Sequence, residues 1–104
     1  MICGGLTHAK KFLAVAESFG KQTEVMSWGN TLGSAANLHL MCSSPSCEWF
    51  EMAVPYEPYE YGMLDVLRPD EQGMMSMPQK PGLGVDVDWQ AMDAATIHKF
   101  VVEL

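Results

Sequence analysis

The sequence predicts an α/β fold in which helices cover a parallel sheet, and three observations lead to this prediction. Apolar and small residues recur at helical spacing over residues 9–19 and again over 32–42. Stretches of alternating character follow these two segments, at residues 23–28 and 47–52. Because helix and strand signals succeed one another, the order is that of parallel strands joined by helices.

The first helix is predicted after the turn Gly4-Gly5-Leu6-Thr7, with Thr7 as the N-cap. Gly20 stands where a left-handed residue would end this helix. Its apolar face comprises Ala9, Phe12, Leu13, Ala16 and Phe19.

The first predicted strand, residues 23–28, divides its side chains between two faces. Thr23, Val25 and Ser27 share one face, and the other carries Glu24, Met26 and Trp28. The turn from Trp28 to Thr31 leads into the second helix, whose small residues favour close packing on a sheet.

The second predicted strand, Cys47 to Met52, places Cys47, Trp49 and Glu51 on one face. Glu51 lies at its carboxyl end, and active sites of parallel α/β folds gather at those ends. Glu51 is therefore a candidate functional carboxylate, with a solvated strand-end glutamate as the open alternative.

The second half of the chain has a different character, and we divide the chain at residues 1–54 and 55–104. Residues 55–62 are aromatic, acidic and proline-rich, which predicts an ordered loop. Such a loop could bind a ligand, but covering a neighbouring domain is the favoured interpretation. Turns at 70–73 and 81–84, a short strand at 74–77 and a helix from Asp88 to about Phe100 complete the prediction.

Composition excludes several function classes. The chain has 104 residues, a formal net charge of −7 and no basic run, so neither nucleic acid nor an anionic membrane is an expected partner. The N-terminal residues resemble no signal peptide and no apolar run is long enough to span a membrane, so we expect a cytoplasmic protein. Three cysteines, Cys3, Cys42 and Cys47, are expected to be reduced thiols, and they lack the spacing of a zinc site.

The predicted sheet is too small to stand alone. A closed parallel barrel takes about 250 residues, and two or three strands would leave unpaired edges that invite association. We therefore expect the chain to form part of something larger.

A series of motifs follows in a set order along the chain: Gly4-Gly5-Leu6-Thr7, Trp28-Gly29, Leu32-Gly33, the run from Ala35 to Leu40, Glu51, Pro78 and the run from Pro81 to Val85. This order resembles the C-terminal part of the mandelate racemase and muconate lactonizing enzyme group of the enolase superfamily. The resemblance implies the last third of a modified TIM barrel, followed by a tail that packs on a capping domain. It also implies Mg²⁺-assisted removal of a proton alpha to a carboxylate, with a sugar acid as the substrate.

The same resemblance assigns few residues. The strands that carry the family's metal-binding carboxylates have no counterpart here, so no metal ligand is predicted in this chain. Met26 stands where several members have a histidine base, and methionine cannot transfer a proton. Glu51 matches a glutamate that donates a hydrogen bond to the substrate, which requires a raised pKa in apolar surroundings that Trp49 could supply.

Three further residues complete the predicted site. Glu24 is expected inside the barrel, where a buried carboxylate must be paired or functional. Trp28 and Asn30 are expected at the mouth of the barrel as substrate-binding residues.

Two functions follow from the sequence. The first is a piece of an acid-sugar dehydratase or racemase-like enzyme, inactive until the missing part of the barrel is supplied. The alternative is a non-catalytic module that pairs with copies of itself through exposed strands.

Overall fold

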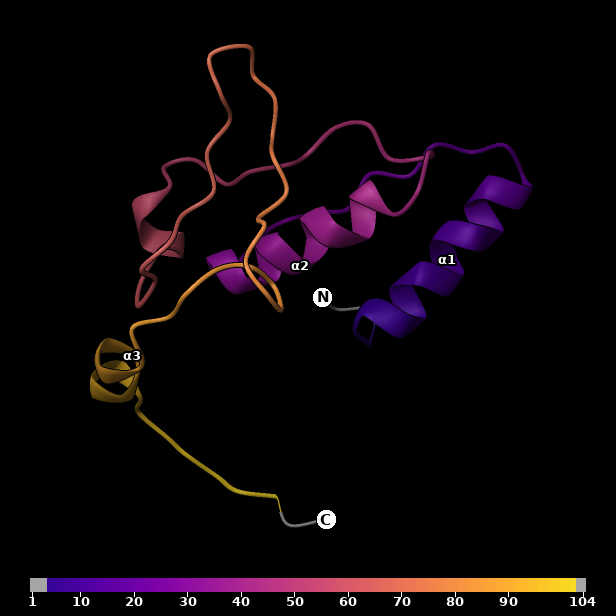
Figure 1. Ribbon diagram of the computed structural model, residues 1–104. Helices are drawn as coiled ribbons and strands as arrows, with labels where there is room; N and C mark the ends of the chain where they lie inside the picture. Colours follow the sequence, from indigo (N-terminus) through magenta and orange to yellow (C-terminus); the bar gives the residue numbers. More distant parts are fainter. Residues whose placement is uncertain (1–3, 103–104) are drawn as a thin grey trace.

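The computed structural model describes residues 4–102, which form two long helices, a short 3-10 turn and a shorter third helix. The elements are α1 (Leu6–Ser18), α2 (Thr31–Cys42), η1 (Glu57–Tyr59) and α3 (Trp89–Ala95). α1 and α2 contact each other, whereas η1 and α3 lie on the opposite side of α2 (Figure 1). The predicted thiol Cys3 lies outside the described residues.

α1 begins at Leu6, two residues earlier than predicted. Its N-cap is Gly5, with φ 87°, and no side chain caps the helix. The prediction of Thr7 as the cap was wrong because the two glycines already turn the chain, which leaves Thr7 in the first helical turn. At the other end Gly20 has φ 61°, and the N–H groups of Gly20 and Lys21 donate to the carbonyls of Glu17 and Ala16. This is the Schellman arrangement, so the predicted stop is confirmed.

α2 is the central element of the fold. The side chain of Asn30 caps it by accepting a hydrogen bond from the N–H of Leu32 at 3.1 Å. Most of its residues are buried: Thr31, Ala35, Ala36, Asn37, Leu38, Leu40 and Met41. The predicted helix of small residues is therefore confirmed, and it packs on several sides.

The predicted strands are not formed as paired strands. Within residues 4–102 the structure contains no β-strand, and its one isolated bridge joins Met63 to Val87 in antiparallel orientation. Residues 23–28 and 47–52 are extended, but a strand needs a ladder of hydrogen bonds to a neighbour. Residues 74–77 also form no strand, because their segment belongs to a loop without a partner along it.

One hydrophobic core joins the two halves of the chain. Ala35 and Leu38 of α2 pack against Leu67, which lies in the second half. Partly buried residues around them are Phe50, Met52, Met75, Leu83 and Val85. The ring of His39 adds a hydrogen bond of 3.2 Å between its Nε2 and the carbonyl of Leu83. α2 thus holds the loop of residues 80–86 as well as the extended segments.

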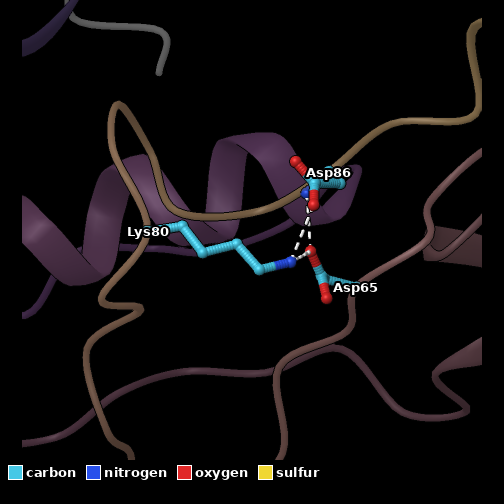
Figure 2. A network of polar contacts seen from close by, with 3 residues as sticks. All are labelled: Asp65, Lys80 and Asp86. Atoms are coloured by element: carbon cyan, nitrogen blue, oxygen red, sulfur yellow. Dashed lines mark hydrogen bonds and ion pairs between the residues drawn. The ribbon is translucent and has the colours of Figure 1, made fainter.

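A polar network fixes the base of that loop. The ammonium group of Lys80 lies 2.6 Å from Asp65 Oδ2 and 2.7 Å from Asp86 Oδ2 (Figure 2). Asp65 Oδ2 also accepts the backbone N–H of Asp86 at 2.7 Å. The predicted turn at 70–73 lies at the tip of a longer loop, residues 63–88. It is confirmed, since Asp70 Oδ1 accepts the N–H groups of Gln72 and Met74.

α3 is shorter than predicted. Asp88 caps it by accepting from the N–H of Ala91 at 2.9 Å, as expected, but the helix ends at Ala95 rather than near Phe100. None of its residues is buried, and a short helix without a packed face gains little from lengthening. From Thr96 the backbone is extended. Among the described residues, no helix combines the length and apolar character needed to cross a membrane.

Candidate functional site

The two extended segments lie side by side and run in the same direction. The N–H of Thr23 donates to the carbonyl of Ser46 at 2.8 Å, and further along both segments the N–H of Trp49 donates to Glu24 Oε2 at 2.9 Å. The first contact joins residues 23 and 46, and the second joins residues 24 and 49. Residue numbers therefore increase in the same direction along both segments, as in a parallel pair. Figure 1 shows the two segments passing behind and above α2 in this shared direction.

Side-chain alternation in these segments separates a buried face from an exposed one. Val25, Ser27, Phe50 and Met52 are buried or partly buried on the α2 side. The intervening residues are exposed: Glu24, Met26, Trp28, Trp49 and Glu51. We call these five residues the outer face. It contains three of the four predicted site residues, Glu24, Trp28 and Glu51.

Glu24 is exposed among residues 4–102, and its predicted place inside a barrel stays a prediction. Its side chain is exposed, and its carboxylate accepts the N–H of Trp49. Among the described residues the Glu24 carboxylate stays open to water. The contact with Trp49 ties the two extended segments together.

Glu51 is likewise exposed, at the end of the second segment. Trp49, expected to give it apolar surroundings, is itself 71% exposed. Within residues 4–102 these two side chains therefore do not form a closed pocket. Glu51 is free to meet a ligand or another segment of protein.

Trp28 and Asn30 lie at the start of α2, beside the aromatic loop. The Trp28 ring meets Tyr59 edge to face, with centroids 6.1 Å apart. The side chain of Asn30 caps α2 with its oxygen, and its nitrogen donates to the carbonyl of Tyr61 at 2.9 Å. Both polar ends of Asn30 are thus engaged, so this residue holds the loop in place rather than presenting a free amide.

The aromatic loop also contributes residues that the sequence did not single out. A small cavity of about 30 Å³, roughly the space of one water molecule, lies where the loop covers the ends of the extended segments. Ser27, Thr31, Tyr56, Tyr59 and Glu60 line it. The mixture of tyrosines and carboxylates in residues 56–61 was the sequence signal that could have identified these residues. It could not show which extended segments the loop would cover.

Arg68 pairs with Glu60, a carboxylate of the aromatic loop. Its guanidinium donates two hydrogen bonds to the carboxylate of Glu60 and lies 4.1 Å from the centre of the Tyr56 ring. These hydrogen bonds hold the pKa of Glu60 below its ordinary value and raise that of Arg68. Glu60 is consequently a paired anion and a poor candidate for proton transfer near neutral pH.

The described residues do not make a metal centre. Nowhere in residues 4–102 do three or more histidine, cysteine, aspartate or glutamate side chains gather as they would around an ion. Of the cysteines in this range, Cys42 and Cys47 are free thiols. Burial raises the pKa of the Cys47 thiol, which keeps it protonated. The donor set that Mg²⁺ prefers, several oxygens converging on one point, is not supplied here.

The described residues thus form a helix-backed pair of parallel extended segments whose outer face carries two carboxylates and two tryptophans. Comparison with known proteins identifies the family. A model of the enolase C-terminal domain-like family matches residues 1–91. The chain belongs to this family, and the predicted resemblance is confirmed.

Three relatives show how far the likeness extends. A D-galactonate dehydratase family member from Streptomyces sp. (strain SPB074) is 39% identical over 87 residues, which cover 82% of this chain and 20% of the relative. D-xylonate dehydratase from Haloferax volcanii is 25% identical over 99 residues, covering 91% of this chain and 23% of the relative. A crystal structure of a protein from Pseudovibrio sp., described as a mandelate racemase/muconate lactonizing enzyme, has a TM-score of 0.88 at 38% identity, covering 92% of this chain and 26% of that one. The chain thus spans about a fifth to a quarter of each relative.

Proposed function

We propose that this chain forms the C-terminal part of the barrel of an acid-sugar dehydratase of the enolase superfamily. The observation that carries the proposal is the outer face, where Glu24, Trp28 and Glu51 share one side of two neighbouring segments that run in parallel. In the proposed barrel this side faces inward. Residues 1–54 supply barrel units, and residues 55–104 return towards a capping domain.

Glu51 has the clearest proposed role. It stands at the carboxyl end of its segment and is unpaired among the described residues, so it can donate a hydrogen bond to a substrate carboxylate or enediolate once the barrel closes around it. Closure would bring the apolar surroundings that Trp49 alone does not provide. A carboxylic acid in such surroundings stays protonated and can act as a donor.

The other site residues have supporting roles. Glu24 links the two segments through Trp49 and keeps the outer face rigid. Trp28 offers an aromatic wall beside Tyr59, and Asn30 positions the loop that carries Tyr59 and Tyr61.

The proposed enzyme needs groups that these residues do not supply. Mg²⁺, when bound in the complete enzyme, offsets the charge that develops on the substrate oxygens. Its ligands and the base that removes the alpha proton have no candidates among the described residues. We therefore expect the isolated chain to be inactive on sugar acids.

Grafting tests this proposal. Residues 1–91, carrying Met26→His because methionine cannot transfer a proton, replace the matching section of Haloferax volcanii D-xylonate dehydratase, and conversion of D-xylonate is followed with Mg²⁺ present. The grafted protein should regain activity, and the isolated chain should show none. Turnover by the isolated chain, or a folded graft without activity, would contradict the proposal.

A matched pair of variants tests Glu51 in the active graft. Glu51→Gln removes the acidic proton and should lower kcat by about 10²–10⁴-fold, the usual contribution of a positioned acid or base. Glu48→Gln changes an exposed glutamate on the same segment but on its other face, and should leave kcat unchanged. Equal effects of the two substitutions on kcat would contradict the proposed role of Glu51.

A further inference from the structure

The aromatic loop, residues 55–62, is held by a clamp that one arginine forms. Arg68 donates two hydrogen bonds to the carboxylate of Glu60, and the one between Nη2 and Oε2 is 2.9 Å long. The guanidinium also lies 4.1 Å from the centre of the Tyr56 ring, which is a cation–π contact. Tyr56 precedes η1 and Glu60 follows it, so Arg68 holds this short helix from both ends.

Arg68 is in turn tied to the hydrophobic core. Its Nη1 donates to the carbonyl of Leu67 at 2.8 Å, and Leu67 packs against Ala35 and Leu38 of α2. The Glu60 side chain is only 19% exposed, so its carboxylate depends on the guanidinium for hydrogen bonds that water supplies poorly. The clamp therefore connects the aromatic loop to the most buried part of the molecule.

The loop transmits this fixed position to Trp28. Tyr59 lies within η1, and its ring meets the Trp28 ring edge to face, at 6.1 Å between centroids and 89° between planes. This is a favoured geometry for an aromatic pair. Nearby, the side chain of Asn30 donates to the carbonyl of Tyr61 at 2.9 Å, which fastens the end of the loop to the start of α2. The orientation of the Trp28 ring thus depends on where the loop is held.

Trp28 has ring surface to offer to a ligand. It is 62% exposed and belongs to the outer face together with Glu24 and Glu51. The carbon chain of a sugar acid carries C–H groups that pack on a flat aromatic ring, while its hydroxyl and carboxylate groups need polar partners. An aromatic wall beside a few polar groups is the usual composition of a small-molecule site.

We propose that Arg68 is a positioning residue of the substrate site, because its clamp on η1 makes Tyr59 hold the Trp28 ring against the carbon chain of a bound sugar acid. The substrate in this inference rests on the proposed function. The coupling of Arg68 to Trp28 does not, since every contact that carries it lies within residues 28–68. Arg68 acts through the loop and not by contact with the substrate.

Fluorescence anisotropy of Trp28 tests the coupling without any substrate. The measurement uses the full chain with Trp49 and Trp89 replaced by phenylalanine. Arg68→Met should increase the rapid motion of the Trp28 ring severalfold, and Tyr59→Ala should do the same. Tyr59→Phe is the matched control, because it keeps the ring and should leave the motion unchanged. If Arg68→Met leaves the Trp28 ring as restricted as in the parent chain, the proposal is overturned.

Two further variants separate the clamp from general loosening of the structure. Lys80→Met breaks the ion pairs at the base of the 63–88 loop and should not alter the motion of Trp28. Arg68→Lys keeps the charge but loses the planar fork, so it should free Trp28 almost as much as Arg68→Met does. It also provides the test if Arg68→Met reduces the helical signal in circular dichroism. An equal response to Lys80→Met would overturn the proposal.

Kinetics in the graft with D-xylonate dehydratase test the consequence for binding. Arg68→Met should raise KM for D-xylonate about fivefold, the size expected for loss of one aromatic contact, with kcat unchanged. In a Trp28→Ala background the same substitution should have no further effect on KM, because Arg68 acts through that ring. Effects of Arg68→Met and Trp28→Ala that simply multiply would show that Arg68 acts elsewhere, and would overturn the proposal.

Failure of this inference and failure of the proposed function give different results. An inactive wild-type graft contradicts the proposed function and with it the contact between Trp28 and a sugar acid, while the anisotropy of Trp28 still decides whether Arg68 positions the ring. An active graft whose KM is unaffected by Arg68→Met overturns this inference and leaves the proposed function standing.

Discussion

Asn37 shows how one polar side chain can organise the packing around it. It stands on the buried side of α2, and its amide nitrogen binds the carbonyl of Met26 and the hydroxyl of Ser27. These two hydrogen bonds fasten the first extended segment to the helix beneath it. The position of Met26 and Trp28 on the outer face therefore depends on a residue that lies on the opposite side of the segment.

Replacement of Asn37 should be costly for this reason. Asn37→Ala removes both hydrogen bonds and leaves the Met26 carbonyl without a partner, so the free energy of unfolding should fall by about 1–3 kcal/mol. Urea denaturation followed by circular dichroism measures the change. Gln22→Ala, at an exposed position in the preceding turn, is the control and should stay within about 0.5 kcal/mol of the wild type. Equal effects would mean that Asn37 does not fasten the segment.

Individual site residues were only partly predictable from the sequence. Alternation correctly grouped Glu24 with Trp28, and it placed Glu51 with Trp49, because period-two patterning follows from the extended backbone itself. The burial of Glu24 was not predictable in the same way. Burial depends on whether another segment covers the side chain, and among residues 4–102 Glu24 stays exposed.

At the scale of elements, the loop of residues 63–88 is held by charge as much as by packing. Lys80 is shared between Asp65 and Asp86, and Leu64 donates its N–H to the carbonyl of Asp86 at 3.0 Å. The hydrogen bond from Lys80 holds the pKa of Asp65 below its ordinary value, and Asp65 raises the pKa of Lys80 in return. Lys80 is exposed and Asp65 is partly exposed, so the network fixes local geometry more than it adds global stability.

The pH dependence of this loop follows from the directions in which the pKa values of Asp65 and Lys80 are shifted. The lowered pKa of Asp65 gives stabilisation that is complete above about pH 4 and is lost as pH falls through the folded-state value. The raised pKa of Lys80 gives stabilisation that is complete below about pH 10 and is lost as pH rises through its folded-state value. Hydrogen-exchange protection of the Asp86 amide should therefore be steady between these limits and fall in acid.

Lys80→Met tests the same network at neutral pH, because it keeps the aliphatic stem and removes the charge. Protection of the Asp86 and Leu64 amides should fall, whereas Lys21→Met, on the exposed turn after α1, should leave both unchanged. If Lys80→Met leaves the Asp86 amide as protected as before, the loop is held by packing alone.

The elements themselves were predicted unevenly, and the reason is physical. The helices over residues 6–18 and 31–42 were predictable because their hydrogen bonds are internal and their stop and start residues, Gly20 and Asn30, act locally. Strands were not, since each requires a neighbour that supplies the other half of its hydrogen bonds. α3 was overestimated because its sequence could not show that no surface would pack against residues 96–100.

At the scale of the whole molecule, the chain is more open than a closed domain. Its radius of gyration is 15.2 Å. A compact domain of about 100 residues has a value near 13 Å. All three tryptophans are exposed, Trp28 by 62%, Trp49 by 71% and Trp89 by 68%. Such exposure of large aromatic surface is typical of proteins that bury these side chains against another segment.

Tryptophan fluorescence can test which surface becomes buried. In single-tryptophan variants of the isolated chain, acrylamide should quench Trp28, Trp49 and Trp89 alike. In the graft with D-xylonate dehydratase, quenching of Trp28 and Trp49 should fall severalfold, because the outer face is proposed to turn inward. Trp89, on α3, serves as the comparison and should remain accessible. If Trp49 stays fully quenched in an active graft, the outer face is not the inner wall of the barrel.

The unequal anchoring of the two long helices has a consequence for how the molecule opens. α1 buries Leu13 alone, whereas α2 buries residues along most of its length. The free energy needed for α1 to swing away is accordingly a small fraction of that needed to unfold the core. Among the described elements, α1 is then the helix that detaches before the core unfolds. A segment of protein that packs against α1 would therefore slow this opening more than it would slow global unfolding.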